Sequence, residues 1–323
     1  MIVTLTPNPS IDQTVDLGAE LGLGLVQRAT SISQVAGGKG VNVSLAMHKA
    51  GVNTLAVVPS CANDEFLQLL QSTGIPTRTL AAPGAVRVNV AITEPDGRTT
   101  KLNGPGPTHT PATKSELIAG IADTAADAHW AVLAGSLPGG LGEDFYPEVV
   151  SELRRKAPDC LIAVDTSDAP LRALAAQLHV AAPDLMKPNG EELGQILGID
   201  GIELEKRACA GDVAPIAQAA GELVARGVRF VLITLGEAGA VLASPEGCWH
   251  AQAPEIDVVS TVGAGDSALS GFLLAHESGK PLPDCLRQAI AYGSTAASLP
   301  GTTIPAPTDV PIKFYEAITV TAL

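Results

Sequence analysis

Residues 213–235 read VAPIAQAAGELVARGVRFVLITL, and this stretch decides the fold class. The apolar residues at positions 213, 216, 220, 223 and 224 follow the 3.6-residue period of a helix and share one face. Gly227 is placed to end that helix. The continuous apolar run Phe230–Leu235 is typical of a parallel strand that is buried on both faces. The stretch therefore predicts a helix followed by a central strand of a parallel sheet.

Similar apolar runs occur at Ala131–Ala134 and Leu161–Val164, with helical patterns between them. This alternation predicts an α/β fold whose mainly parallel sheet is covered by helices. One segment differs, because large apolar residues alternate with smaller or polar ones before the turn residues Glu94–Gly97: Val86, Val88, Val90 and Ile92 with Arg87, Asn89, Ala91 and Thr93. Such a pattern predicts an antiparallel hairpin with one polar face. We expect this hairpin to form a lid, with Arg87 and Asn89 on its polar side.

The charge balance excludes one class of partner. Among 323 residues, 20 are basic and 34 acidic, so the net charge is −14. An acidic surface repels a nucleic-acid backbone, and any anionic ligand must be held by a local cluster of Lys and Arg. Only ten residues are aromatic. Recognition must therefore depend on backbone and small polar groups, and we expect a small-molecule ligand.

The cysteines and the N-terminal residues bear on the compartment. The five cysteines are widely spaced and form no C-x-x-C pair, which favours free thiols over a disulfide framework or a zinc site. The first residues lack a basic flank with a long apolar run, and no stretch approaches a membrane span. We expect a cytoplasmic protein with no membrane partner.

The segment Ser260–Ser267, STVGAGDS, is the most specific local motif. It follows an apolar strand pattern and opens a helical run, so small residues leave the first-turn N–H groups free to bind an anion. Gly263, Ala264 and Gly265 would stabilise the charge of a transferring phosphoryl group, and Asp266 would accept a proton from the attacking hydroxyl.

Two other interpretations of this motif remain open. Asp266 can serve only as a helix-capping residue after a glycine turn. The spacing Gly263-x-Gly265-x-x-Ala268 also satisfies the dinucleotide-binding fingerprint, although that fingerprint normally opens the first βαβ unit of a nicotinamide enzyme.

Residues 37–42, GGKGVN, form a second glycine-rich motif before a helix. Its spacing around Lys39 does not match a Walker P-loop, which requires a glycine at position 33 and a hydroxyl at position 40. The glycines nevertheless allow the backbone to approach a ligand while Lys39 supplies a positive charge. A glycine turn with a solvated lysine is the simpler alternative.

Two further elements carry polar groups at strand or helix ends. Asp12 follows an apolar strand and suits sugar hydroxyls, although turn chemistry also explains such a residue. Asn189 and Glu192 lie three residues apart at a helix start, which suits a hydrated Mg²⁺ ion near a triphosphate. The alternative for this pair is an ordinary helix cap. The six histidines show no zinc spacing, and Ser136 lacks the glycines of a nucleophile elbow, so hydrolase chemistry is not indicated.

Five motifs occur in a fixed order along the chain: Thr6–Asp12, Gly37–Asn42, Gly135–Pro138, Lys187–Glu192 and Ser260–Ser267. Together they resemble the motifs of the PfkB, or ribokinase-like, carbohydrate kinases, over residues 1 to about 307. The resemblance implies a three-layer, Rossmann-like α/β core with a small β-sheet lid, a homodimer that pairs its lids, and ATP and Mg²⁺ as cosubstrates. It implies one domain over residues 1–323, with lid segments near 11–16, 23–35 and 86–102.

The same resemblance implies roles for individual residues. Asp266 would be the base and residues 263–265 the anion hole. The expected contacts to the sugar hydroxyls are Asp12, Gly38 and Asn42, and those to the phosphate already on the sugar are Lys39, Arg87, Ser136 and Arg28. The expected contacts to the nucleotide and to Mg²⁺, the latter through water or phosphate, are Lys187, Asn189, Glu192, Thr234, Gly236 and Gly239. The chain departs from the family pattern at Gly104, where an acidic residue is typical.

The expected reaction is transfer from ATP to a ketohexose monophosphate, first of all fructose 1-phosphate giving fructose 1,6-bisphosphate. Tagatose 6-phosphate and fructose 6-phosphate are alternative acceptors. A catalytically silent sugar-phosphate sensor on the same fold is an alternative of another class, and the presence of Asp266 argues against it.

Overall fold

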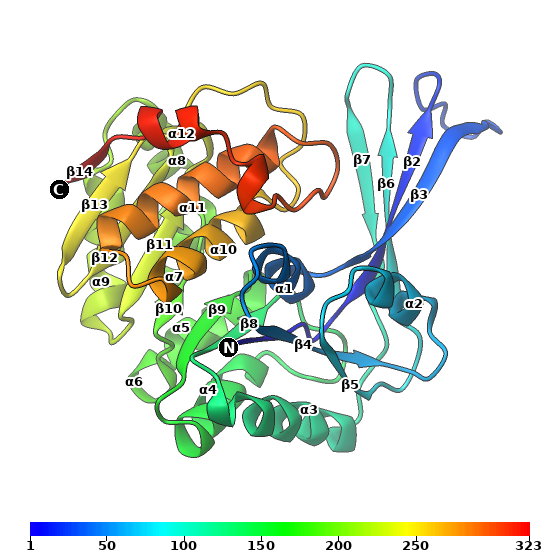
Figure 1. Cartoon of the computed structure of the whole chain (residues 1–323), viewed down its shortest axis with the longest axis horizontal. Helices are drawn as coiled ribbons and strands as arrows, with labels where there is room; N and C mark the ends of the chain where they lie inside the picture. The colour runs from blue at the N-terminus through cyan, green and yellow to red at the C-terminus, as the bar shows by residue number, and fades with distance from the viewer.

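The computed structural model describes residues 1–323 and divides the strands between a large sheet and a small one (Figure 1). The large sheet has ten strands, of which those from β5 to β11 in spatial order run parallel and the remaining three pair antiparallel. In spatial order they are β14 (Val320–Ala322), β13 (Gly247–Ala251), β12 (Ala240–Ser244), β11 (Phe230–Thr234), β10 (Leu185–Met186), β9 (Leu161–Asp165), β8 (Trp130–Ala134), β1 (Ile2–Leu5), β4 (Thr54–Ser60) and β5 (Thr77–Ala81).

Helices cover both faces of this sheet and give the predicted three-layer α/β architecture. Successive strand residues point to opposite faces, so Val231 and Ile233 pack into one core while Phe230 and Leu232 pack into the other. The first core is covered by α3 (Pro111–Thr124), α4 (Phe145–Lys156), α5 (Asp168–Ala176), α6 (Leu178–Ala181), α7 (Gly190–Leu197), α8 (Gly201–Cys209) and α9 (Ala214–Ala225). The second is covered by α1 (Lys39–Lys49), α10 (Ala264–Glu277), α11 (Leu282–Ala297) and α12 (Ile312–Ala317).

The stretch that predicted the fold class forms the expected helix and strand. Helix α9 ends near Gly227, whose φ of 105° is a conformation that favours glycine, and the buried strand β11 follows. This strand pairs in parallel with β10, as predicted, and antiparallel with β12. The predictions of a mainly parallel sheet and of a central buried strand are thus confirmed.

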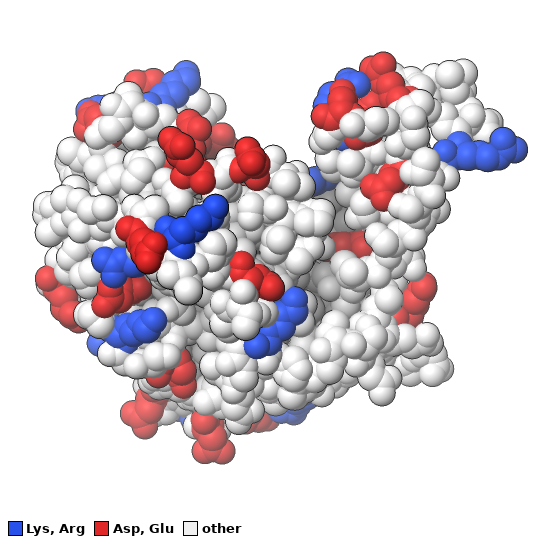
Figure 2. Space-filling view, turned by 45° about the horizontal axis from the view of Figure 1, so that its top comes forward, with Lys and Arg blue, Asp and Glu red and all other residues white.

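The small sheet stands apart from the α/β body, at the upper right of Figure 1. The predicted hairpin is confirmed, because β6 (Arg87–Thr93) and β7 (Thr99–Asn103) pair antiparallel. The other two strands are β2 (Ser10–Leu17) and β3 (Ala29–Gly37), and their base packs near α2 (Glu65–Ser72). We call this four-stranded sheet the lid. Figure 2 shows a hollow between the lid and the body.

The parallel strands position the functional side chains. Their carboxyl ends meet at one edge of the sheet, where open α/β folds bind ligands. The motif residues follow β1, β8, β10 and β11 at this edge, and Asp165 is the last residue of β9. The lid is attached at the same edge, because the chain passes from β1 directly into β2.

Candidate active site

The centre of the site is the start of α10. Gly263 precedes the helix with a φ of 79°, a left-handed conformation that a residue with a side chain rarely adopts. The first-turn N–H groups of a helix lack intrahelical partners and carry the positive end of the helix dipole. Residues 263–265 therefore present a small-residue surface suited to an anion at the predicted helix start, and their role as the anion hole stays a prediction.

Asp266 lies in this first turn and is only 7% exposed. Its Oδ2 accepts a hydrogen bond of 2.8 Å from Asn42 Nδ2, which comes from α1. The pKa of Asp266 is raised to about 6, chiefly by burial. Lys39 opposes this shift, and the nearby Asp165 charge adds to it. Because Asn42 engages only one oxygen, Oδ1 is left to accept a proton from a substrate hydroxyl. The pKa suits a base that works near neutral pH.

A buried carboxylate at the end of β9 gathers two lysines beside this helix. Asp165, 1% exposed, accepts a 2.9 Å bond from Lys39 Nζ at Oδ1, and its Oδ2 lies 3.4 Å from Lys187 Nζ. Burial opposes the charge of Asp165, but Lys187 and Lys39 outweigh it and lower the pKa of Asp165. A Cβ at Gly265 would lie 3.2 Å from Lys187 Nζ, so this lysine reaches the anion hole. The basic cluster inferred from the net charge is present at this point.

Lys39 lies in this cluster, next to the expected base. Burial disfavours the charged form of Lys39, but Asp165 and Asp266 outweigh that effect and raise the pKa of Lys39 above its ordinary value. The contact of Lys39 with Asp165 places this lysine near the anion hole. The role expected from the resemblance, binding of the phosphate already on the sugar, stays a prediction.

The polar face of the lid carries the residues expected to bind the sugar. Asp12 Oδ1 accepts hydrogen bonds from Ser10 Oγ at 2.7 Å and from Asn89 Nδ2 at 3.0 Å. A Cβ at Gly37 would lie only 2.2 Å from Asp12 Oδ2, so the glycine lets β3 pass close to this carboxylate. Gly38, with a φ of 122°, then turns the chain from the lid into α1. The structure thereby places Asp12 of β2 beside the short connection that carries Gly38 and Lys39.

Arg87 shares this face, because β2 and β6 pair with Ser10 opposite Arg87 and Asp12 opposite Asn89. Its guanidinium donates a 3.2 Å bond to the carbonyl of Gly104, and its buried Nε has no partner. Partial burial lowers the pKa of Arg87 and the charge of Asp12 opposes this shift, but a guanidinium stays protonated throughout. A Cβ at Gly104 would lie 2.8 Å from the carbonyl oxygen of Val88. Glycine thus allows the loop to approach Arg87 and orient it.

Two expected phosphate ligands lie in different places. Ser136 Oγ lies 3.5 Å from Nδ2 of the buried Asn8, after β8 and close to the loop that carries Gly104. Arg28 is exposed and precedes β3 at the end where Ala29 pairs with Leu17. The nine residues of β3 span roughly 25 Å. The structure therefore brings Ser136 to the sugar side of the site but does not bring Arg28 there within one chain.

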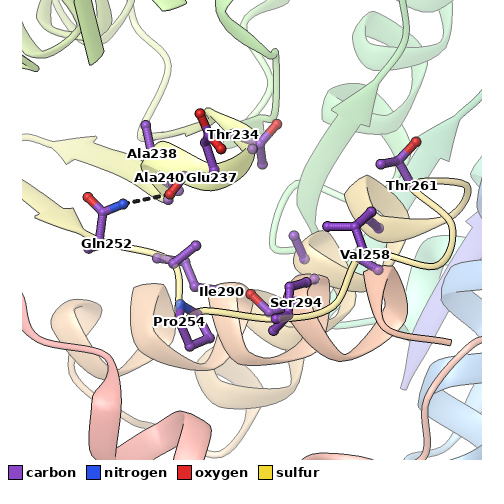
Figure 3. Close-up of a pocket in the computed structure, with 18 of the residues that line it drawn as sticks. Thr234, Glu237, Ala238, Ala240, Gln252, Pro254, Val258, Thr261, Ile290 and Ser294 are labelled. Atoms are coloured by element: carbon purple, nitrogen blue, oxygen red, sulfur yellow. Dashed lines mark hydrogen bonds between the residues drawn. The ribbon is translucent and has the colours of Figure 1, made fainter. Parts of the chain in front are cut away.

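Three of the six residues expected at the nucleotide, Thr234, Gly236 and Gly239, line one cavity of about 970 Å³ (Figure 3). Lys187, Asn189 and Glu192 are not among its lining residues. In Figure 3, Thr234 and Ala238 lie on one side and Ile290 and Ser294 of α11 on the other, with Thr261 at one end. Gly236, Gly239, Ala264 and Gly265 also line the cavity. The lining contains the carboxylates of Glu237, Glu255 and Asp257 but no Lys or Arg. A polyphosphate bound in this cavity would therefore extend toward Gly265 and Lys187, where a cation is available.

Asn189 and Glu192 form a reciprocal helix cap at the start of α7. Asn189 Oδ1 accepts from the N–H of Glu192 at 2.7 Å, and Glu192 Oε2 accepts from the N–H of Asn189 at 2.9 Å. The capping alternative is confirmed, and the metal role stays a prediction. Burial raises the pKa of Glu192, although the bond from Asn189 opposes the shift. One carboxylate oxygen, Oε1, stays free to meet a hydrated cation.

Comparison with known proteins shows the family of the chain. Residues 6–309 match the pfkB family carbohydrate kinase. The chain belongs to the PfkB family of carbohydrate kinases. This family membership excludes the nicotinamide interpretation of the 263–268 spacing, and the structure gives the reason: that glycine turn follows the antiparallel strand β13, not the first strand of the parallel sheet.

Curated relatives of this PfkB kinase extend over nearly the whole chain. A 1-phosphofructokinase of Haloferax volcanii is 33% identical over 316 residues, which cover 96% of this chain and 95% of that protein. A 1-phosphofructokinase of Escherichia coli K12 is 32% identical over 302 residues, covering 92% and 91%. Among solved structures, phosphofructokinase-2 of Escherichia coli in complex with substrates and products superposes with a TM-score of 0.84 at 26% identity, covering 98% of each chain.

Two residues of the site were missed by the sequence analysis. Asp165 ends an apolar strand that was predicted correctly, and an acidic residue at that point is the available sequence signal. Asn8 lies within the first motif, and a Cβ at Gly106 would lie 2.3 Å from its Oδ1, so the two segments meet closely. That contact depends on tertiary structure and leaves no local pattern.

Proposed function

We propose that this PfkB kinase transfers the γ-phosphoryl group of ATP to fructose 1-phosphate and produces fructose 1,6-bisphosphate and ADP. One observation carries the proposal: Asp266, with one free carboxylate oxygen, lies at a helix N-terminus with the polar face of the lid on one side and the nucleotide cavity on the other. The preference for fructose 1-phosphate rests further on the relatives that bear the name 1-phosphofructokinase.

The proposed mechanism uses groups from both sides of α10. The lid holds the sugar through Asp12 and Asn89, so that a free hydroxyl meets Oδ1 of Asp266. As this oxygen attacks the γ-phosphorus, Asp266 accepts its proton and the bond to the β-phosphate oxygen breaks, which releases ADP. The N–H groups of residues 263–265, with Lys187, stabilise the charge on the transferring group.

Mg²⁺ fits the donor groups that this site offers. No cluster of three or more His, Cys, Asp or Glu side chains forms a protein cage for a metal ion. Mg²⁺ commonly keeps several waters and binds through substrate phosphates with one or two carboxylates. The free Oε1 of Glu192, supported by Asn189, suits that outer position. When bound, the ion would neutralise phosphate charge on the nucleotide.

We assign Asp165 the role of positioning Lys39 and Lys187 around the transferred phosphoryl group. Asp165→Asn should lower kcat roughly tenfold, because a neutral amide holds neither lysine by charge. It should also move the acid limb of the pH–rate profile to lower pH, since the Asp165 charge helps to raise the pKa of Asp266. Steady-state kinetics at several pH values provide the measurement.

The matched control is Asp184→Asn, which removes a carboxylate that pairs with Arg154 at 2.9 Å. Asp184 lies at the amino ends of β9 and β10, whereas Asp165 lies at the carboxyl end of β9. This control should leave kcat and the pH profile unchanged. A kcat for Asp165→Asn within about twofold of the parent, with an unmoved acid limb, would remove Asp165 from this role.

We further propose a homodimer that pairs lids. The lid face opposite Asp12 carries Ile32, Val88 and Leu102, all exposed in the single chain. Exposed apolar side chains grouped in this way are typical of an interface. Arg28 takes part in phosphate binding only if a second copy brings it to a site. Light scattering should give the mass of two chains, and the mass of one chain would contradict the pairing.

We place the enzyme in the cytoplasm, since none of its five cysteines is in a disulfide. No helix is long and apolar enough to cross a bilayer.

The kinase activity itself is tested by following ADP formation from ATP and Mg²⁺. ADP should appear only when a sugar phosphate is added. ATP hydrolysis that is indifferent to every sugar phosphate would contradict the proposed function.

A further inference from the structure

We propose that His250 and Gln252 position the turn that forms the nucleoside end of the nucleotide cavity, and that they thereby set the affinity for ATP. This inference rests on the proposed nucleotide site. The turn is the short 3₁₀ segment η2 (Gly236–Ala238), which connects β11 to β12 and includes cavity-lining residues. His250 belongs to β13, and Gln252 follows that strand directly.

The turn leaves two carbonyl groups without backbone partners. Its own bonds use the carbonyls of Leu235 and Gly236, which accept from the N–H groups of Ala238 and Gly239 at 3.1 and 3.0 Å. The carbonyls of Glu237 and Ala238 come next in the chain and point out of the end of the turn, as is usual for the last residues of a short helix. The half-buried carbonyl of Ala238 needs a donor, whereas the carbonyl of Glu237 lies on the exposed side of the turn.

His250 and Gln252 supply those donors. Gln252 Nε2 donates to the carbonyl of Glu237 at 2.6 Å, the dashed line in Figure 3, and His250 Nε2 lies 2.8 Å from the carbonyl of Ala238. A carbonyl only accepts, so Nε2 of His250 carries the proton. The two residues are separated by one position and so share a face of the extended chain. Two consecutive carbonyls are thus held by two side chains, one from β13 and one from the residue that follows it.

The backbone places this strand close to the turn. A Cβ at Gly239 would lie 1.9 Å from the carbonyl oxygen of Ala251, so β13 and the turn are in direct contact at that glycine. Gly236 and Gly239 have positive φ values of 57° and 85°, which residues with a side chain rarely adopt. The turn therefore begins and ends at positions that favour glycine. The side-chain bonds fix its orientation at the outer end, where the backbone ladder between β12 and β13 gives no bond to residues 237 and 238.

The position of the two bonds from His250 and Gln252 predicts which part of ATP binding depends on them. Gln252 and Glu237 lie at the opposite end of the cavity from Thr261, which precedes the anion hole (Figure 3). The polyphosphate must reach the anion hole at the Thr261 end, so the base and ribose occupy the end at Gln252. A change there should weaken binding of the nucleoside part of ATP without moving Asp266, the lysines or the lid.

The test uses uncharged variants, so that net charge near the nucleotide stays the same. Gln252→Met and His250→Phe each remove one donor and retain much of the side-chain volume. Each should raise both the KM for ATP and the directly titrated Kd roughly threefold to tenfold, the effect of about one hydrogen bond. The values of kcat and of the KM for the sugar phosphate should stay within twofold. The double variant should lose less than the product of the single effects, because both bonds hold one turn.

Three controls separate positioning from general destabilisation. His250→Gln restores a donor of similar reach and should recover most of the ATP affinity, whereas inhibition by inorganic tripolyphosphate, which lacks a nucleoside, should be the same in all variants. Glu246→Gln, on the β12–β13 turn at the far end of the hairpin, should behave as the parent.

Unchanged ATP affinity in folded Gln252→Met and His250→Phe proteins would overturn the inference. A parallel loss of ATP affinity, tripolyphosphate inhibition and kcat would overturn it as well, since that pattern indicates damage to the whole site. Failure of the unsubstituted protein to bind ATP would overturn the proposed function together with this inference.

Discussion

Asp266→Asn should reduce kcat by roughly 10² to 10⁴, the usual contribution of a positioned general base. The asparagine keeps the volume of the side chain and its place in the first turn of α10, but it cannot accept a proton from the attacking hydroxyl. The KM values for ATP and for the sugar phosphate should change little, because proton transfer takes place after both substrates are bound. Steady-state kinetics of the purified variant, with circular dichroism to verify folding, provide the measurement.

The pH dependence of the parent enzyme tests the same residue without a substitution. Burial raises the pKa of Asp266 to about 6, and the base must be deprotonated to act. The acid limb of the kcat profile should therefore fall as pH drops through about 6. Asp266→Asn should lose this limb. A kcat for the variant within about threefold of the parent, with the limb retained, would assign Asp266 a capping role only.

The phosphate already present on the sugar should dominate substrate selection. The parent should use fructose 1-phosphate with a specificity constant at least roughly 10³ times that for free fructose, since a site built for a charged group leaves its buried polar atoms unpaired without it. Arg87→Ala should raise the KM for the sugar phosphate roughly 10-fold to 100-fold, the contribution of hydrogen bonds to a charged group. The orphaned Nε of Arg87 and its bond to Gly104 motivate this assignment.

Two comparisons keep this prediction specific to the sugar phosphate. The KM for ATP should stay the same in Arg87→Ala, because the nucleotide cavity contains no lid residue. The rate with free fructose should also stay the same, because no phosphate is then lost. If Arg87→Ala weakens ATP alone, the arginine acts on the nucleotide and the lid has been assigned to the wrong substrate.

The fold could be predicted largely from the sequence, because its strongest elements have local signals. The helix and strand in residues 213–235, the buried strands at β8 and β9 and the lid hairpin each follow from hydrophobic periodicity and turn residues. The antiparallel extension by β12, β13 and β14 did not follow, since it depends on how three short strands pair with one another.

The site could be predicted only in part, and the reason is physical. Glycine-rich turns, strand ends and helix starts have sequence patterns, and these predicted Asp266, Asp12 and Asn189. The nucleotide residues Thr234, Gly236 and Gly239 were predicted only from the resemblance to the PfkB family. Tertiary contacts have none, so the contact of Asp165 with Lys39 and Lys187 and the donation by His250 and Gln252 to η2 became visible only in three dimensions. Arg28 was predicted at the site but lies away from it within one chain. No sequence pattern indicated that the length of β3 separates Arg28 from Gly37 by about 25 Å.

The proposed reaction is defined by which sugar phosphate is phosphorylated and at which carbon. The decisive measurement is a set of initial rates with ATP and Mg²⁺ for fructose 1-phosphate, fructose 6-phosphate and tagatose 6-phosphate, with the new phosphate located in the product by ³¹P NMR. We expect the highest specificity constant for fructose 1-phosphate and a new phosphate on carbon 6. A higher specificity constant for either 6-phosphate, with the new phosphate on carbon 1, would contradict the proposed reaction.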